Sequence, residues 1–404
     1  MKDNQAKYPQ LRFKCFTDPW EQRKLGEVAD IIGGGTPSTN VSEYWNGDID
    51  WYSPVEIGNQ IYIDESQKKI TGLGLQKSSA HILPVGTVLF TSRAGIGNTA
   101  ILAKEGCTNQ GFQSIVPYKD LLNSYFIFSR TSELKRYGEI NGAGSTFIEV
   151  SGKQMAKMPI SVPSIEEQQK IGTFFKQLDD TITLHQRKLA KLKELKQGYL
   201  QKLFPKNGSK FPQLRFAGFA DAWEQRKFGE LYKKNLERNK DHFSSDRTIS
   251  IATMRFKKEG NGAAENSLVS YKVLREGDIA FEGHTSKRFA FGRFVLNDIG
   301  DGIMSPRFTT LRPTQDMPIK FWKQYIHYEP IMRYPIVNST KLGTMMNELV
   351  VDEFLNQPVL VPELPEQEKI GSFFQQLDET IALHQRKLEK LQELKKGYLQ
   401  KMFC

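Results

Sequence analysis

The chain has 404 residues, enough for two or more domains with separate hydrophobic cores. Its hydrophobic content of 39% and charged content of 25% are typical of globular proteins, and no apolar run reaches the roughly 20 residues that cross a bilayer. The polar N-terminus does not resemble a signal peptide and the three cysteines are isolated, so we expect a cytoplasmic protein without membrane association. A net charge of +10 favours a polyanionic partner, most commonly nucleic acid.

The most informative feature is an internal repeat. The lead-in segment YPQLRFKCFTDPWEQRKLGEV at residues 8–28 returns as FPQLRFAGFADAWEQRKFGEL at 211–231. Residues 162–204 return as 361–403, with 31 of 43 positions identical. The two middles, roughly 29–161 and 232–360, show no comparable match. A shared frame around two different inserts indicates one scaffold that presents two different recognition surfaces.

The first middle begins with the glycine-rich stretch IIGGGTPSTN and continues in short β-rich runs separated by Gly, Pro and Asn. We predict a small mixed domain with irregular loops. The glycines at 33–35 fit a phosphate cradle, although a tight turn is the simpler explanation. Polar and basic loop side chains are candidate DNA contacts because they can bond base edges, while a solvated surface role is the alternative for each. In this domain the candidates are Thr36, Ser38, Lys77, Ser78, Arg93, Asn109, Gln110 and Gln113.

A long helix is predicted next, because no proline occurs between Pro163 and Pro205. Its apolar residues alternate in steps of four and three, the a/d seam of a helix that pairs with another helix. At about 1.5 Å per residue, this helix would span about 60 Å. The seam positions are Ile171, Phe175, Leu178, Ile182, His185, Leu189, Leu192, Lys196, Tyr199 and Leu203.

The second middle contains runs that alternate apolar and polar residues, as half-buried strands do. The stretch FWKQYIHYEPIMRY predicts a helix interrupted at Pro330. Five consecutive polar residues beginning at His284 interrupt a strand pattern and suggest a loop tip. The candidate DNA contacts of this domain are Arg247, Arg255, Lys257, Lys258, His284, Lys287, Arg288, Arg293, Arg307 and Lys341.

A second long helix repeats the seam, and two such seams in one chain are expected to pair. The heptads alone do not choose between parallel and antiparallel pairing. An antiparallel pair would place the middles at opposite ends of a rod and bring His185 and His384 close together. Two histidines alone are a poor zinc site, since zinc takes four ligands, so we predict a polar layer that fixes the register. The second seam consists of Ile370, Phe374, Leu377, Ile381, His384, Leu388, Leu391, Lys395, Tyr398 and Met402.

Several motifs of catalytic proteins are missing from the sequence. It contains no G-x-x-x-x-G-K-[ST] loop, no H-E-x-x-H, no cysteine and histidine cluster, and no Gly-rich dinucleotide fingerprint. It also lacks an Asn-Pro-Pro-Tyr type tetrapeptide, which adenine methyltransferases use. We therefore predict no catalytic residue, no metal site and no cofactor in this chain.

These features together resemble the specificity (S) subunit of type I restriction-modification enzymes, over nearly the whole chain. The most specific element is the duplicated helix, with P-x-x-x-E-Q-x-K-I-G-x-F-F-x-Q-L-D in both copies, followed by LHQRKL and GYLQK. Residues 34–54 and the NQGF at 109–112 also look like a first target-recognition domain of that family. The second middle, with YKVLREGDIAFEG at 271–283, is similar but less diagnostic.

The fold class expected from the repeat and the resemblance is α+β. Two mixed, β-rich target-recognition domains would be separated by two long helices that pair as an antiparallel coiled coil, giving a pseudo-two-fold internal repeat. The expected domains are 1–161 (lead-in segment and first recognition domain), 162–204 (first spacer helix), 205–360 (lead-in repeat and second recognition domain) and 361–404 (second spacer helix).

The resemblance also implies partners. Each recognition domain would read one half of a split sequence in double-stranded DNA, and the helices would dock two methyltransferase (M) subunits. The resulting complex would methylate adenine with S-adenosylmethionine bound by M. Restriction (R) subunits would add a nuclease that depends on ATP and Mg²⁺. None of these catalytic sites would belong to this chain.

Two other readings are possible. The chain could be a methyltransferase or nuclease in its own right, but the missing cofactor motifs and the lack of room for a catalytic domain argue against this. It could also be a coiled-coil scaffold for protein assembly without sequence-specific DNA binding. Salt-dependent DNA binding would separate a DNA reader from such a scaffold.

Overall fold

The structure is a computed structural model that describes residues 8–403 except 59, 94, 144–148, 207, 241–242, 261, 288 and 344–345. The chain divides into two compact units, the first formed by residues 1–186 and 386–404 and the second by residues 187–385. Each unit therefore contains one lead-in segment, one middle and a part of both long helices. Among the helices within the described ranges, none has the length and apolar character needed to cross a membrane.

The repeated lead-in segments close the two domains in the same way. Each contributes a short strand that pairs antiparallel with the strand immediately before a long helix. The pairs are β1 (Glu21–Lys24) with β10 (Pro159–Val162) in unit 1, and β11 (Glu224–Lys227) with β22 (Pro358–Val361) in unit 2. The sequence repeat thus brings the beginning and the end of each middle together.

An arginine of each lead-in segment also clamps the first turn of a long helix. In unit 1, the Arg12 guanidinium donates to both carboxylate oxygens of Glu167, at 2.7 and 2.6 Å. In unit 2, Arg215 donates to Glu366 in the same way, at 2.8 and 2.6 Å. Both carboxylates are almost fully buried, so each pair is a charge-assisted bond within the protein interior.

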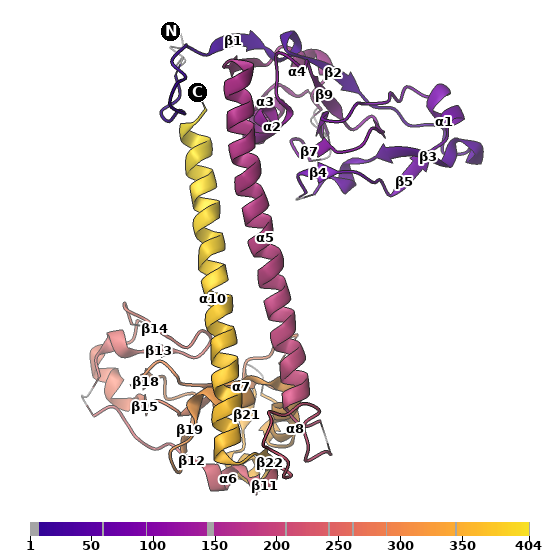
Figure 1. Cartoon of the computed structure of the whole chain (residues 1–404). Coiled ribbons are helices and arrows are strands. Elements are labelled where there is room, and N and C mark those ends of the chain that lie inside the picture. The colour runs from indigo at the N-terminus through magenta and orange to yellow at the C-terminus, as the bar shows by residue number, and fades with distance from the viewer. Residues whose placement is uncertain are drawn as a thin grey trace. The chain divides into compact units, whose positions relative to one another are not determined.

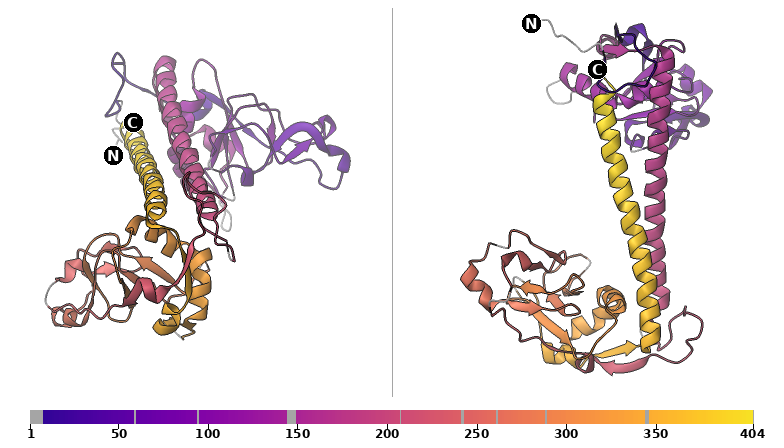
Figure 2. Two further views of the ribbon diagram at one scale, coloured as in Figure 1. Left: turned by 60° about the horizontal axis from the view of Figure 1, so that its bottom comes forward. Right: turned by 60° about the vertical axis from the view of Figure 1, so that its left-hand side comes forward.

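The first middle and the end of its lead-in segment, in unit 1, contain two sheets and seven short helices within the described residues. The five-stranded sheet has the order β2-β9-β6-β7-β4, and the three-stranded sheet has the order β5-β3-β8. Figure 1 shows β3, β5 and α1 at the end of the domain away from α5, and the left-hand view of Figure 2 agrees. The strands are β2 (Ala29–Gly33), β3 (Trp45–Tyr52), β4 (Tyr62–Ile63), β5 (Lys68–Ile70), β6 (Val88–Phe90), β7 (Thr99–Leu102), β8 (Cys107–Thr108) and β9 (Gln113–Pro117). The helices are η1 (Leu25–Glu27), η2 (Ser42–Tyr44), η3 (Pro54–Glu56), α1 (Gly72–Gln76), α2 (Ser124–Ser129), α3 (Thr131–Asn141) and α4 (Gly152–Ala156).

The second middle, in unit 2, has a four-stranded sheet of order β12-β19-β16-β17 and the two-stranded sheets β13-β14, β15-β18 and β20-β21. The small sheets β13-β14 and β15-β18 lie on the side away from α10, and α7 lies beside it (Figure 1). The strands are β12 (Tyr232–Lys234), β13 (Ile249–Ser250), β14 (Arg255–Phe256), β15 (Lys272–Leu274), β16 (Ile279–Glu282), β17 (Arg293–Leu296), β18 (Gly302–Met304), β19 (Thr309–Pro313), β20 (Thr340–Lys341) and β21 (Glu348–Leu349). The helices are α6 (Phe228–Leu231), η4 (Ser245–Arg247), η5 (Glu265–Ser270), α7 (Ile319–His327), α8 (Glu329–Asn338) and α9 (Val351–Leu355). The predicted interruption near Pro330 is confirmed, because α7 ends before it and α8 starts anew.

Each unit has a main hydrophobic core that its domain shares with the long helices. In unit 1 this core includes Trp20 of the lead-in segment, Phe126 of α2, and the rings of Phe175 and Phe403, which stack 5.8 Å apart. The core of unit 2 has the matching set of Trp223, Phe204, Phe321 and Phe374. The recognition domains are therefore packed directly on the helices within their own units.

The two long helices are α5 (Ile165–Leu203) and α10 (Leu364–Lys401), and they contact each other in both units. In unit 1, the rings of Phe174 and Tyr398 lie 5.0 Å apart, and Lys395 lies 2.5 Å from Asp179. Every one of the predicted seam residues is buried or half-buried, and none is exposed.

The contacts in unit 2 repeat those of unit 1 with the roles of the helices exchanged. The rings of Tyr199 and Phe373 lie 4.9 Å apart, and Lys196 donates to Asp378 at 2.6 Å. The two seam lysines are thus paired with carboxylates of the other helix, which explains how polar residues are accommodated in an otherwise apolar seam. The predicted α+β architecture with two long contacting helices is confirmed.

Candidate nucleic-acid interface

Three loops of the first domain meet at the glycines 33–35. The backbone N–H of Gly35 donates to the carbonyl of Thr108 at 2.8 Å, and its own carbonyl accepts from the Trp51 indole at 2.8 Å. A Cβ on Gly34 would lie only 1.9 Å from the carbonyl oxygen of Asn109. Close backbone packing therefore requires glycine at positions 34 and 35, whereas a Cβ on Gly33 would make only ordinary contacts. Residues 33–35 form no tight turn, and the phosphate cradle stays a prediction.

Most of the predicted contacts of this domain lie on these loops. The Thr36 hydroxyl hydrogen-bonds the side-chain carbonyl of Gln110, which links the first loop to the third. Asn109 turns its side-chain oxygen inward to accept from the N–H of Gly111 at 2.8 Å, and Ser78 donates to the carbonyl of Leu75 at 3.3 Å. The exposed candidates are Ser38, Lys77 and Gln110, and the half-buried ones are Thr36, Ser78, Arg93, Asn109 and Gln113.

Arg93 belongs to a fourth loop that joins the same cluster. The preceding Ser92 donates its backbone N–H to the carbonyl of Gly111 at 2.8 Å, and the Arg93 guanidinium lies 3.9 Å from the Glu149 carboxylate. We call residues 33–38, 77–80, 91–93 and 108–113 the first loop cluster. It brings together all eight candidates of the first domain.

In the second domain, the loop after β16 connects two hairpins. The carbonyl of Gly283 accepts from the Asn347 N–H at 2.9 Å, which ties this loop to the β20-β21 hairpin that carries Lys341. Arg293, at the end of the loop, donates to the carbonyl of Ala252 in the β13-β14 turn at 3.2 Å. One loop thus connects four of the candidates, at positions 284, 287, 293 and 341. Three more, Arg255, Lys257 and Lys258, lie on the adjoining β13-β14 hairpin or just after it.

Not every candidate of the second domain is available to a ligand in the same way. The Arg247 guanidinium lies 4.1 Å over the ring of Phe256 and donates to the Asp301 carbonyl, and Arg293 donates to Glu282 at 2.6 Å. Arg307 is exposed and lies 4.7 Å over the ring of Phe308. The exposed candidates are Arg255, Lys257, Lys258, His284, Lys287, Arg307 and Lys341, while Arg288 lies outside the described residues.

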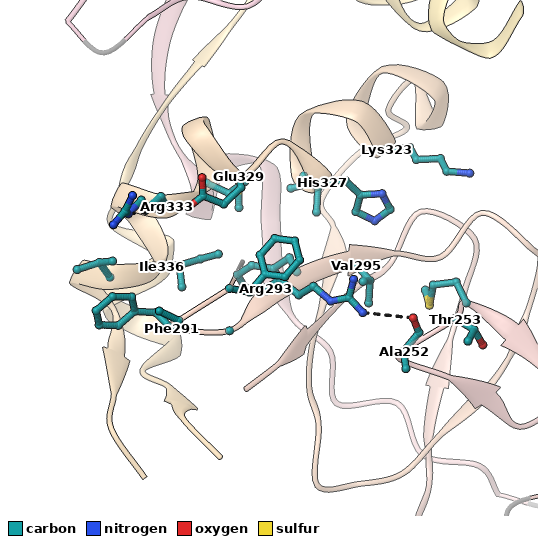
Figure 3. A pocket seen from close by; sticks show the side chains of 18 of the residues that line it. Ala252, Thr253, Phe291, Arg293, Val295, Lys323, His327, Glu329, Arg333 and Ile336 are labelled. Carbon is teal, nitrogen blue, oxygen red and sulfur yellow. Dashed lines mark hydrogen bonds and ion pairs between the residues drawn. The ribbon is translucent and has the colours of Figure 1, made fainter. Parts of the chain in front are cut away.

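A cavity of about 520 Å³ adds two basic residues that the sequence interpretation missed. Lys323 of α7 and Arg333 of α8 line it together with Lys287 and Arg293, and we call this cavity the basic groove. Figure 3 shows Arg293 bonded to Ala252, with Lys323 towards one end of the groove and Arg333 at the other. The sequence interpretation considered only loop residues, and so it passed over cations on helices.

His327 in the same groove carries no charge at neutral pH. Its Nε2 accepts a hydrogen bond from the Leu296 N–H at 3.1 Å, which requires that this nitrogen is unprotonated. Burial lowers the pKa of His327 to about 4, and the nearby Lys323 ammonium adds to the shift. The positive charge of the groove therefore comes from lysine and arginine.

Three acidic residues of the second domain, Glu237, Asp278 and Asp301, are held in one network of ion pairs. Arg312 donates to Asp278 at 2.8 Å and to Glu237 at 2.5 Å, and Arg275 donates to Glu237 at 2.6 Å and to Asp301 at 2.7 Å. Burial raises the pKa of Asp278, and the hydrogen bonds from Arg312 offset this only in part. This network fixes the sheet and loops in place. Within the described ranges, no group of three or more His, Cys, Asp or Glu side chains is arranged to hold a metal ion.

Comparison with known proteins identifies the chain. The family described as "Type I restriction modification DNA specificity domain" matches residues 17–194 and again residues 220–393. The chain belongs to this family. It is a DNA-recognition subunit with two repeated specificity domains, and it is not itself the enzyme. The prediction of two repeated domains and the resemblance are both confirmed.

Several specificity subunits are similar to this one over long stretches. The specificity subunit of a type I restriction enzyme of Methanocaldococcus jannaschii is 27% identical over 404 residues, which cover 95% of this chain and 92% of that one. One from Escherichia coli is 30% identical over 177 residues, covering 42% of this chain and 43% of that one. The crystal structure of an S subunit from M. genitalium has a TM-score of 0.60 at 14% identity, covers 98% of this chain and 99% of that one, and shows the same fold.

Proposed function

We propose that this specificity subunit reads a bipartite target in double-stranded DNA, with each recognition domain reading one half. The first loop cluster would contact one half-site, and the loop after β16 with its two hairpins would contact the other. The observation that carries the proposal is the pair of domains built on one frame, whose sheets and loops differ while the closing strand pairs, lead-in clamps and helix contacts repeat. The domain boundaries proposed are those predicted, at 161, 204 and 360.

The helices are proposed to form an antiparallel coiled coil that relates the domains by a pseudo-two-fold axis and sets the gap between half-sites. The support comes from each unit separately. In unit 1 the start of α5 contacts the end of α10, and in unit 2 the end of α5 contacts the start of α10. His185 and His384 keep their proposed role as polar positions that fix the register. Changing both to leucine without any effect on stability or partner assembly would disprove that role.

The chemistry is proposed to reside in partner subunits. Two methyltransferase subunits would bind S-adenosylmethionine and methylate adenine at the target, and restriction subunits would use ATP and Mg²⁺ to cleave DNA. The complex would work in the cytoplasm, where its DNA is found. This division of labour is supported by the family to which the chain belongs and by the ion-paired state of the clustered carboxylates in the second domain.

Salt dependence of DNA binding tests the proposal. The purified complex of this chain with its methyltransferase partner should bind duplex DNA with an affinity that falls steeply between 50 and 200 mM salt. For about 6–10 phosphate contacts the expected loss is roughly 10³–10⁵-fold. A stable complex whose DNA binding is absent or independent of salt would instead favour the assembly scaffold.

A further inference from the structure

The basic groove of the second domain is formed by elements that are far apart in the sequence. Lys287 and Arg293 come from the loop after β16 and from β17, and Lys323 and Arg333 come from α7 and α8. Among the described residues that line the same cavity, two side chains, Asp298 and Glu329, are acidic. Its volume of about 520 Å³ lies within the ~300–1,000 Å³ of typical ligand sites. The groove therefore suits an anionic ligand.

The cations of the groove differ in how firmly the protein holds them. Lys323 lies 2.5 Å from Asp298, and Arg293 is fixed by Glu282, so these two are oriented before any ligand arrives. Arg333 is exposed and its guanidinium lies 3.8 Å from Glu329, beyond hydrogen-bond distance. The Arg333 guanidinium is therefore exposed at the cavity wall, without a hydrogen bond to Glu329.

Arg333 also belongs to a short sequence that recurs in the first domain. The stretch RYPIVN at 333–338 on α8 shares its Arg, Tyr and Asn, three of six positions, with RYGEIN at 136–141 on α3. Each helix is followed by an antiparallel pairing of described residues, which is the isolated bridge between Ala143 and Glu149 after α3 and the β20-β21 pair after α8. Arg136 is exposed, like Arg333. An exposed arginine retained in two domains that otherwise differ is best explained by a ligand common to both.

The feature that two different half-sites share is the sugar–phosphate backbone, because phosphates are identical in every sequence while base edges differ. We infer that the basic groove holds the DNA backbone of its half-site through Arg333 and Lys323, and that Arg136 makes the equivalent contact in the first domain. This inference rests on the proposed function and assigns these residues to positioning the DNA, whereas the loop residues read the bases.

The experiment uses the complete chain in complex with its methyltransferase partner. Binding of a short labelled duplex that carries the target mapped for the wild-type complex is compared with binding of a scrambled duplex, over a series of salt concentrations. The variants are R333Q, K323Q and R136Q. K320Q is the matched control, because Lys320 is an exposed lysine of the same helix α7 that does not line the groove.

Each groove variant should weaken binding of both duplexes by the same factor. In a plot of log affinity against log salt concentration, loss of one phosphate contact lowers the magnitude of the slope by about 0.9. If the affinities of variant and wild type are equal at 1 M salt, the variant then binds about eight-fold more weakly at 0.1 M. K320Q should bind like the wild type. R333K keeps the charge and should restore most of the affinity, since lysine binds phosphate as a point charge. The recognised sequence should remain unchanged in all variants.

Several results would each overturn the inference. These are wild-type affinity in R333Q and K323Q, a loss confined to the target duplex, or a changed base preference, which would make these residues base readers. Equal losses in R333K and R333Q would indicate a purely structural role and would also overturn it. If the wild-type complex shows no preference for the target duplex, the proposed function itself fails. That outcome is distinguishable from one in which only the variants behave unexpectedly.

Discussion

The clamp between the lead-in segment and the long helix provides a sharp test of why the lead-in segment repeats. Changing Glu366 to Gln removes the carboxylate that receives two hydrogen bonds from Arg215, whose side chain is only 13% exposed. Removing one partner of a buried ion pair costs about 3–5 kcal/mol, because the remaining charge is left uncompensated. Since about 1.4 kcal/mol is a factor of ten, the local opening equilibrium should rise by roughly two to three and a half orders of magnitude.

Hydrogen exchange measured by mass spectrometry locates this effect. In E366Q, backbone amides after the first turn of α10 should lose protection by about that factor, while the start of α5 in unit 1 stays protected. E167Q is the mirror experiment and should affect the start of α5 instead, because Arg12 makes the same two bonds to Glu167. E368Q is the matched control, since Glu368 is exposed on the same helix and its loss should cost less than about 0.5 kcal/mol.

The reasoning would be refuted if the loss of hydrogen-exchange protection in E366Q corresponded to less than about 1 kcal/mol of opening free energy. It would also be refuted if protection fell equally in both units. Either result would mean that the repeated arginine is retained for another reason than the clamp.

Three further predictions concern other parts of the chain. Burial lowers the pKa of His327 to about 4, from an unfolded value near 6.5, so the contribution of neutral His327 to stability is complete above pH 6.5 and is lost as the pH falls towards 4. The free energy of urea unfolding of unit 2 should therefore be about 2 kcal/mol lower at pH 5 than at pH 7, and H327Q should remove this difference. G34A should push apart the two loops that meet at Gly34 and Asn109, destabilise the first domain by about 1–3 kcal/mol in thermal unfolding, and weaken recognition of one half-site. The control G72A, where the added Cβ meets open space, should leave recognition unchanged. Inserting four residues near Lys191 should keep both half-sites and change the unread gap between them, as mapped by methylation; an altered base preference within a half-site would contradict this ruler.

The helices could be predicted from the sequence because their pattern is local. Heptad spacing alone selected seam residues, of which none is exposed, and the residue types within one helix determine that pattern. Even the seam lysines, which the pattern left unexplained, find carboxylates on the other helix. The function followed from the repeat together with the family resemblance.

The recognition surface was only partly predictable, since it depends on contacts between distant residues. Thr36 and Gln110 were selected as loop residues, but the bond between them joins positions 74 residues apart. Residue type was also an imperfect guide, because Arg247 and Arg293 have the chemistry of DNA contacts and are engaged within the domain. Arg333 was missed because it lies on a helix, and only its recurrence at 136 could have singled it out.

Mapping of modified adenines tests the central claim most directly. The chain is expressed with its methyltransferase partner, and methylated positions are determined across a genome. The account predicts one bipartite motif whose two halves are separated by an unread gap of fixed length. Exchanging one middle for that of another specificity subunit should change one half of the motif and leave the other half unchanged. A motif that stayed the same after both exchanges, or methylation by a complex lacking this chain, would contradict the claim that these two domains read the DNA.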